Sequence, residues 1–63
     1  MKYSEAIKLL RKKMILSQME FADYLDVSFG TVNRWENNKF VPTVKMKRKL
    51  APLFKKYGIE VED

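Results

Sequence analysis

The chain contains neither cysteine nor histidine, and this absence limits how a chain of 63 residues can be stabilised. Without cysteine, neither a disulfide nor a thiolate-bound metal can supplement a small core. Without histidine, the commonest general base and the commonest metal ligand are missing together. A chain of this length buries only about 60% of the surface that its unfolded form exposes. We therefore expect one domain, whose core is made of well-packed apolar side chains or is completed by a second subunit.

Basic residues exceed acidic residues by 13 to 8, and the excess is concentrated in segments. Residues 1–13 carry a net charge of +4 and residues 34–57 carry +7, whereas residues 14–33 and 58–63 carry −3 each. Any single lysine is explained by a solvated helix face, but a concentrated positive block destabilises a small body by self-repulsion. The excess favours an acidic partner, nucleic acid before an anionic membrane. No apolar run resembles a signal sequence or a membrane span, so we expect a cytoplasmic protein.

Only two glycines and two prolines interrupt the chain, which predicts helices joined by short turns. Hydroxyl N-caps, apolar spacing and stop residues place helices at about Ser4–Met14, Ser17–Asp26, Ser28–Asn37 and Thr43–Gly58. Pro52 should kink the last helix or start a new turn, because it lacks an N–H and clashes with the carbonyl of Arg48. The prediction is a compact all-α bundle of four to five helices, with a domain at residues 1–57 and a short acidic tail at 58–63.

The segment from Ser17 to Glu36 has the pattern of a helix, a tight turn and a second helix, which is a helix-turn-helix. A family resemblance is carried by Leu16, Ser17, Gln18, Phe21, Ala22, Leu25, Asp26, Val27, Ser28, Thr31, Val32, Arg34, Trp35, Glu36, Asn37 and Pro42. This pattern resembles the Cro/C1-type repressors (the XRE family), from near Ile7 to about Leu53. The resemblance implies a lambda-repressor-like fold and a sequence-specific regulator that binds double-stranded DNA. It also implies a small phage- or prophage-like repressor that binds a palindromic operator as a homodimer.

The helix that starts after Ser28 is the candidate recognition helix. With Val32 and Trp35 predicted to face the core, the outward positions are Phe29, Gly30, Asn33 and Arg34. These are the positions at which the resembling family reads base edges. Arginine can donate two hydrogen bonds to guanine, asparagine can pair with adenine, and phenylalanine can contact a thymine methyl. Two alternatives stay open: Phe29 could fold back onto the core, and Gly30 could simply be tolerated at a small cost to the helix.

A second group of residues suits the sugar-phosphate backbone, which positions a protein on DNA without reading sequence. Gln18 lies at a helix N-terminus, where backbone N–H groups favour an anion, and the resembling family uses this glutamine on DNA. The predicted backbone set is Gln18, Ser28, Thr31, Asn37, Asn38, Lys39 and Lys45. Asp26 and Asn38 stand where the family usually has glycine, and both residue types tolerate a left-handed backbone.

Two further predictions concern structure and assembly. Arg11 and Glu36 resemble a structural ion pair of the family, between the first and third helices, so Arg11 is predicted to be part of the scaffold. Apolar residues near the C-terminus exceed what a small core needs, and they form a candidate dimer interface. Its residues are Leu53, Phe54, Tyr57, Ile59 and Val61. The alternative is that these residues complete the core of one chain.

Other classes of function fit the sequence less well. A protein-interaction module of the same fold, such as an antitoxin with a toxin partner, remains the alternative to a DNA-binding regulator. An enzyme is not expected, because the chain offers no histidine, no cysteine, no convincing carboxylate pair and no glycine-rich phosphate loop. No cofactor or metal is expected either.

Overall fold

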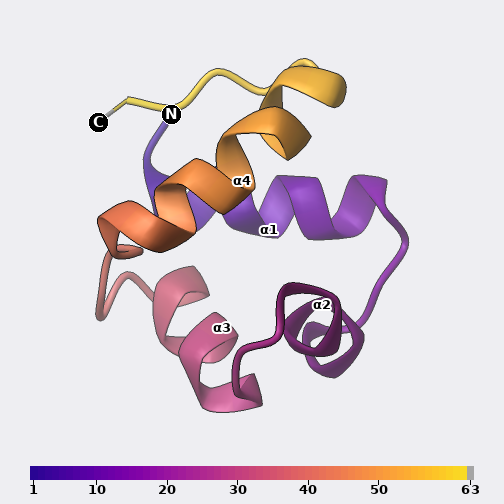
Figure 1. The fold of residues 1–63 in the computed structure, drawn as a ribbon, viewed down its shortest axis with the longest axis vertical. Coiled ribbons are helices and arrows are strands. Elements are labelled where there is room, and N and C mark those ends of the chain that lie inside the picture. The colour runs from indigo at the N-terminus through magenta and orange to yellow at the C-terminus, as the bar shows by residue number, and fades with distance from the viewer. Residues whose placement is uncertain (63) are drawn as a thin grey trace.

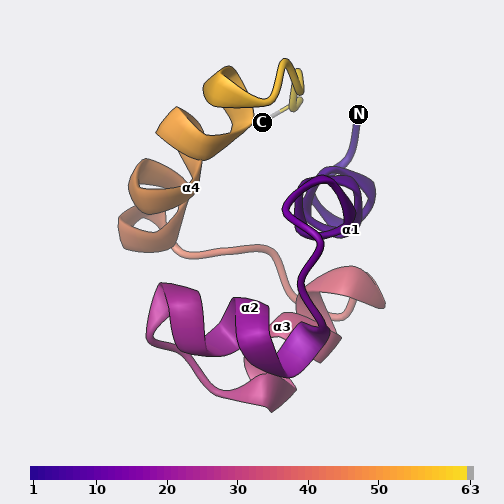
Figure 2. The ribbon, with the colours of Figure 1, turned by 90° about the vertical axis from the view of Figure 1, so that its right-hand side faces the viewer.

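A computed structural model describes residues 1–62, which form four helices and no strand (Figure 1). The helices are α1 (Tyr3–Lys13), α2 (Gln18–Leu25), α3 (Phe29–Glu36) and α4 (Val44–Lys56). α3 packs against both α2 and α1, and α4 lies beside α1, as the turned view in Figure 2 also shows. The all-α prediction is confirmed. None of the helices within residues 1–62 is long and apolar enough to cross a membrane.

The second, third and fourth helices begin where the sequence predicts. The hydroxyl of Ser17 accepts a hydrogen bond from the backbone N–H of Glu20 at 3.0 Å, and the Glu20 carboxylate accepts one from the Ser17 N–H at 2.9 Å. This reciprocal pair is a capping box. Ser28 caps α3 and Thr43 caps α4 through the same type of bond, at 3.1 and 3.3 Å. Each cap satisfies an N–H that a helix start leaves without a partner.

The first helix begins earlier than predicted, and Ser4 is not its N-cap. The carbonyl of Lys2 accepts the first helical hydrogen bond, from the N–H of Ala6 at 2.9 Å, and Lys2 makes no side-chain cap. Tyr3 is thereby the first helical residue, with its ring centroid 6.2 Å from that of Phe54. From this first helical position the Tyr3 ring packs against α4.

Pro52 neither ends α4 nor starts a fifth helix, because Val44–Lys56 is one helix with the proline inside it. The helix ends at Lys56, and Gly58, the predicted stop residue, follows it with a φ of 68°. The N–H of Gly58 donates to the Lys55 carbonyl at 3.2 Å, and the N–H of Ile59 donates to the Phe54 carbonyl at 2.8 Å. This pair of bonds is a Schellman motif, in which a hydrophobic contact commonly follows the glycine.

That motif directs the C-terminal segment back onto the body of the protein. Ile59 and Phe54 are both buried, so the core of one chain extends beyond residue 57. Further along, the N–H of Glu62 donates to the Met1 carbonyl at 2.8 Å, and the Glu62 carboxylate lies 3.3 Å from the terminal amine. Within residues 58–62, Ile59 therefore packs into the core, Glu62 bonds to Met1 and no strand forms. The final acid of the tail, Asp63, lies outside the described residues.

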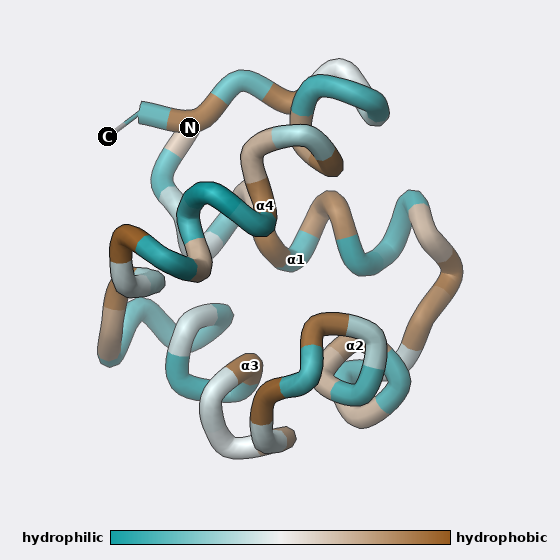
Figure 3. Tube along the Cα trace, in the orientation of Figure 1, coloured by the Kyte–Doolittle hydropathy of each residue, from teal (hydrophilic) through white to brown (hydrophobic). Residues whose placement is uncertain are grey.

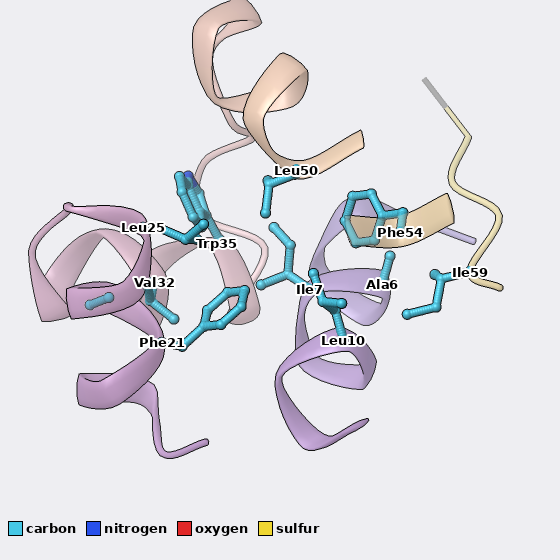
Figure 4. Close-up of a cluster of buried hydrophobic side chains, with 11 residues drawn as sticks. Ala6, Ile7, Leu10, Phe21, Leu25, Val32, Trp35, Leu50, Phe54 and Ile59 are labelled. Carbon is cyan, nitrogen blue, oxygen red and sulfur yellow. The ribbon is translucent and has the colours of Figure 1, made fainter. Parts of the chain in front are cut away.

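The core lies where the four helices meet (Figure 4). Hydrophobic and hydrophilic residues alternate along the helices (Figure 3). Its buried apolar residues are Ala6, Ile7, Leu10, Phe21, Ala22, Leu25, Val32, Trp35, Leu50, Phe54 and Ile59. Trp35 is 4% exposed, which confirms it as a core residue and leaves no face on which a base could stack. The inward faces predicted for α1, α2 and α3 are therefore confirmed, with Met14 only partly buried.

Within residues 1–62, four residues outside the helices adopt a left-handed backbone, and one of them is unsuited to it. Asp26, Asn38 and Gly58 are residue types that tolerate this conformation, but Ile15, with a φ of 58°, is β-branched. Its side chain is 87% exposed, so packing offsets little of the strain. Replacing Ile15 by asparagine is expected to raise the free energy of unfolding by about 1 kcal/mol. Urea denaturation checks this, with Ile15→Val, which keeps the branched Cβ, as the control that should change little.

Candidate nucleic-acid interface

The turn between α2 and α3 sets the angle at which α3 is presented. Asp26 ends α2 with a φ of 59°, as predicted, and the N–H of Val27 donates to the Ala22 carbonyl at 2.9 Å. Ser28 then caps α3, so three residues connect the two helices. Ala22 is 1% exposed, and its small side chain allows the helices to approach closely. The result is a helix-turn-helix in which one face of α3 packs on the core.

The opposite face of α3 is available to a partner. Phe29 is 48% exposed, which excludes the alternative that it folds back onto the core. Arg34 is exposed, whereas Gly30 and Asn33 are half-buried. The four candidate base-reading residues therefore all reach the surface of the same short helix, with Phe29 and Arg34 the most accessible.

The ion pair between Arg11 and Glu36 joins α1 to α3. The Arg11 Nε and Nη2 atoms donate to the two carboxylate oxygens of Glu36 at 2.7 and 3.0 Å, and Nη1 donates to the Leu16 carbonyl at 3.0 Å. Burial of the Glu36 side chain raises its pKa, but hydrogen bonds from Arg11 and Gln18 and the charge of Arg11 outweigh burial, so the pKa is lowered overall. The same hydrogen bond raises the pKa of Arg11. Arg11 is thus part of the scaffold.

This ion pair also changes how the charge of α3 is understood. Arg34 and Glu36 belong to the same helix, and their charges would cancel if both side chains faced outward. The structure places the Glu36 carboxylate beneath the helix, where Arg11 neutralises it. The outward face of α3 therefore keeps the positive charge of Arg34.

Hydrogen bonds extend from the ion pair to the exposed face of α3, and the sequence alone does not reveal this chain. The Gln18 Nε2 donates to Glu36 at 3.1 Å, and the Gln18 Oε1 accepts from the Asn33 Nδ2 at 3.3 Å. The Asn33 Oδ1 in turn accepts from the Asn37 Nδ2 at 3.2 Å. The side-chain amides of Gln18 and Asn33 each retain one further proton on nitrogen and one lone pair on oxygen, so both are held in place and keep capacity for an outside partner.

The residues predicted to contact the DNA backbone surround the exposed face of α3. Gln18 is the first residue of α2, and Ser28 and Thr31 lie at the start of α3, where their hydroxyls are 2.9 Å apart. The others, Asn37, Asn38, Lys39 and Lys45, are exposed residues of the segment that runs from the end of α3 into α4. Asn38 has the left-handed backbone that the sequence predicts, with a φ of 59°. The set therefore borders both ends of α3.

Sequence analysis missed one residue of this surface. Phe40, in the loop after α3, is 61% exposed, and its ring centroid lies 5.9 Å from the Arg34 guanidinium carbon. An aromatic residue between Lys39 and Val41, in a loop that follows two asparagines, was the available signal. A residue in such a loop is not part of a helix with a buried face, so the exposure of its side chain could have been anticipated.

A capped helix-turn-helix with a polar, positively charged second helix defines a DNA-binding protein of the helix-turn-helix class. A family model described as helix-turn-helix matches residues 7–60, which is most of the chain. The chain belongs to the Cro/C1-type helix-turn-helix family, whose members are DNA-binding transcription regulators. Comparisons with curated proteins and with solved structures give no significant match.

The lowered pKa of Glu36 predicts loss of stability in acid. In the unfolded chain this carboxyl takes up its proton near its ordinary pKa of 4.5, whereas in the folded chain it does so only at lower pH. The unfolded state therefore binds more protons between these two values, and the free energy of unfolding falls as the pH drops through that window. Above the window the contribution of Glu36 is constant.

Urea denaturation at a series of pH values between 7 and 3 measures this effect. Glu36→Gln is expected to be less stable than the wild type at neutral pH and to lose less stability as the pH falls. Glu20 is the matched control, because its pKa is also lowered, by hydrogen bonds from the backbone and side chain of Ser17. Glu20→Gln should keep the part of the acid response that belongs to Glu36, and a Glu36→Gln variant that loses as much stability in acid as the wild type would contradict the assignment.

Proposed function

We propose that the protein is a sequence-specific regulator that binds double-stranded DNA with α3 in the major groove. The observation that carries this proposal is the division of α3 into two faces. Val32 and Trp35 anchor one face in the core, while Phe29 and Arg34 project from the other. A major groove admits one α-helix, and side chains on its outward face reach the base edges.

The roles of the outward residues follow from their chemistry. Arg34 donates two hydrogen bonds to guanine O6 and N7, Asn33 pairs with adenine N6 and N7, and Phe29 contacts a thymine methyl. Gly30 keeps the start of α3 free of side-chain bulk toward the base pairs. The backbone set fixes the register of the protein on the duplex. Acidic Glu20 and Asp23, both exposed on α2, face away from the DNA in this arrangement.

Two copies of the chain are proposed to bind one palindromic operator. An eight-residue helix is only about 12 Å long, so one copy reads few base pairs. Two half-sites about 34–36 Å apart double that number. Phe54 and Ile59, two residues of the predicted interface, are buried within one chain. For these two residues the alternative applies, namely that they complete the core of one chain. Partly buried Leu53, Tyr57 and Val61 remain as the proposed dimer surface.

Operator binding of this kind is typical of repression. We therefore propose a small phage- or prophage-like repressor that acts in the cytoplasm, on the DNA of the nucleoid. Partnership with a protein such as a toxin is the second candidate, and the exposed apolar side chains of Ile15, Met19 and Tyr24 support it. The two candidates are separated by the DNA experiment below, since only the first requires a preferred base sequence.

Selection from a pool of random double-stranded DNA tests the proposed function. We expect enrichment of a palindrome whose half-sites each contain a guanine that Arg34 reads. The Arg34→Ala variant, selected from the same pool, should lose the preference at that one position, at a cost of about 1–3 kcal/mol, and keep the others. A pool that remains random after selection at low salt would overturn the proposal.

A further inference from the structure

We propose that Gly30 and Phe40 clamp the guanidinium of Arg34 between them and so determine how sharply Arg34 discriminates its base. This inference rests on the proposed function and goes beyond it, because it assigns roles in base specificity to Gly30 and Phe40. Gly30 contributes by having no side chain at its position, and Phe40 contributes from the loop outside the recognition helix. Arg34 reads the base, and the other two are positioning residues.

Gly30 forms the first side of the clamp. It lies one turn before Arg34 on α3, so the two positions share a helix face. A Cβ atom built on Gly30 would lie 3.2 Å from the Arg34 Nη1 and 3.6 Å from both Cζ and Nη2. The guanidinium thus rests against bare helix backbone. Gly30 has ordinary helical geometry that any residue adopts, so the missing side chain, and not conformational freedom, distinguishes glycine here.

Phe40 forms the second side. Its ring centroid is 5.9 Å from the Arg34 Cζ, within the range of a cation–π contact. The loop that carries it is tied to Arg34, since the N–H of Lys39 donates to the Arg34 carbonyl at 2.9 Å. Pro42 is buried two residues later and anchors the other side of Phe40. The ring itself is 61% exposed, so the core gains little from it.

This kind of clamp leaves the hydrogen-bonding groups of Arg34 available. Within residues 1–62 Arg34 forms no ion pair, and neither an aromatic face nor a bare helix backbone occupies its N–H donors. An acidic neighbour would hold the side chain equally well, but it would occupy the donors that guanine requires. Restricting the side chain before binding also lowers the entropy lost when the contact forms.

The clamp predicts opposite changes in stability and in specificity for one substitution. Gly30→Ala should raise the melting temperature, because alanine favours a helix more than glycine does. It should also displace the guanidinium and lower discrimination at the base that Arg34 reads. A residue that mattered only to the fold would change both quantities in the same direction.

The experiment compares affinities for the selected operator and for an operator changed only at the guanine assigned to Arg34. Gly30→Ala and Phe40→Leu are each expected to lower this discrimination about two- to fivefold, and to lower it no further when combined with Arg34→Ala. Val41→Ala is the matched control, because Val41 is the next residue of the loop and is 63% exposed.

Three results separate the possible failures. If the wild type prefers no sequence, the proposed function fails. If the wild type is specific but both variants discriminate as it does, the clamp is overturned while the function stands. If the variants weaken discrimination equally in the Arg34→Ala background, they act on the fold or on another contact, which also overturns the clamp. Side-chain NMR of Arg34 provides a readout without DNA: Phe40→Leu should remove the ring-current shift of its Nε–H resonance, and an unchanged shift contradicts the contact.

Discussion

Replacing Glu36 by alanine is expected to lower the free energy of unfolding by about 3 kcal/mol, a large part of what a domain of this size has. The change leaves the Arg11 guanidinium without a counter-ion in a place where its side chain is only 16% exposed. It also removes the acceptor of Gln18, so the loss extends beyond one ion pair. Urea denaturation followed by circular dichroism at neutral pH measures the difference.

Two further variants identify the cause of that loss. Removing both charges, as Arg11→Met with Glu36→Leu, should recover much of the stability, because a buried ion pair replaced by apolar side chains is often neutral in its effect. Glu20→Ala removes an exposed carboxylate from the capping box and is expected to cost less. A Glu36→Ala variant no less stable than Glu20→Ala would contradict the structural role given to the pair.

The same variant connects the fold to the proposed interface. Glu36 holds Gln18, Gln18 accepts from Asn33, and Asn33 lies on the outward side of α3. Loss of the Glu36 carboxylate frees the Gln18 amide to turn, and the Asn33 amide then loses one of the contacts that fix it. The scaffold and the adenine-reading group are therefore parts of one hydrogen-bonded chain.

Local signals predicted most of the fold because they act within a few residues. The Ser17–Glu20 capping box, the Ser28 and Thr43 caps and the Gly58 stop each depend on bonds across one turn. Core positions followed from helical spacing for the same reason. Ser4 failed as a cap because α1 begins one residue earlier, at Tyr3, where the Lys2 carbonyl accepts the first helical bond and no capping side chain marks the start.

The interface was less predictable because its geometry depends on contacts between elements. Spacing placed Phe29 and Arg34 outward, but it carries no information on what lies beside them in space. Phe40 reaches Arg34 through a loop whose path depends on Asn38 and on the anchoring of Pro42. The burial of Ile59 likewise depends on the Schellman turn that returns the chain to α4. A sequence pattern shows none of these paths.

The positive charge around α3 predicts that DNA binding weakens steeply with salt. Lys39 and Lys45 are exposed on the segment after α3, and two copies would bring four such charges to the phosphates. Each neutralised phosphate releases counterions, so the logarithm of the association constant should fall with the logarithm of salt with a slope of about −4. A fourfold rise in salt then weakens binding about 200-fold, as fluorescence anisotropy with labelled operator can measure.

A lysine near the C-terminal end of α4 serves as the control in this experiment, because it distinguishes the effect of direct phosphate contacts from the effect of net charge. Lys45→Gln should reduce the slope to about −2 for two copies, so the same rise in salt weakens binding only about 15-fold. Lys55→Gln removes the same charge near the C-terminal end of α4, away from α3 in both views (Figures 1 and 2), and should leave the slope nearly unchanged. Counterions are released only from phosphates that a basic side chain contacts directly, whereas the long-range attraction between protein and DNA depends on the total charge, wherever a lysine lies on α4. Equal slopes for the two variants would therefore mean that net charge alone governs binding and that the segment after α3 does not follow the backbone.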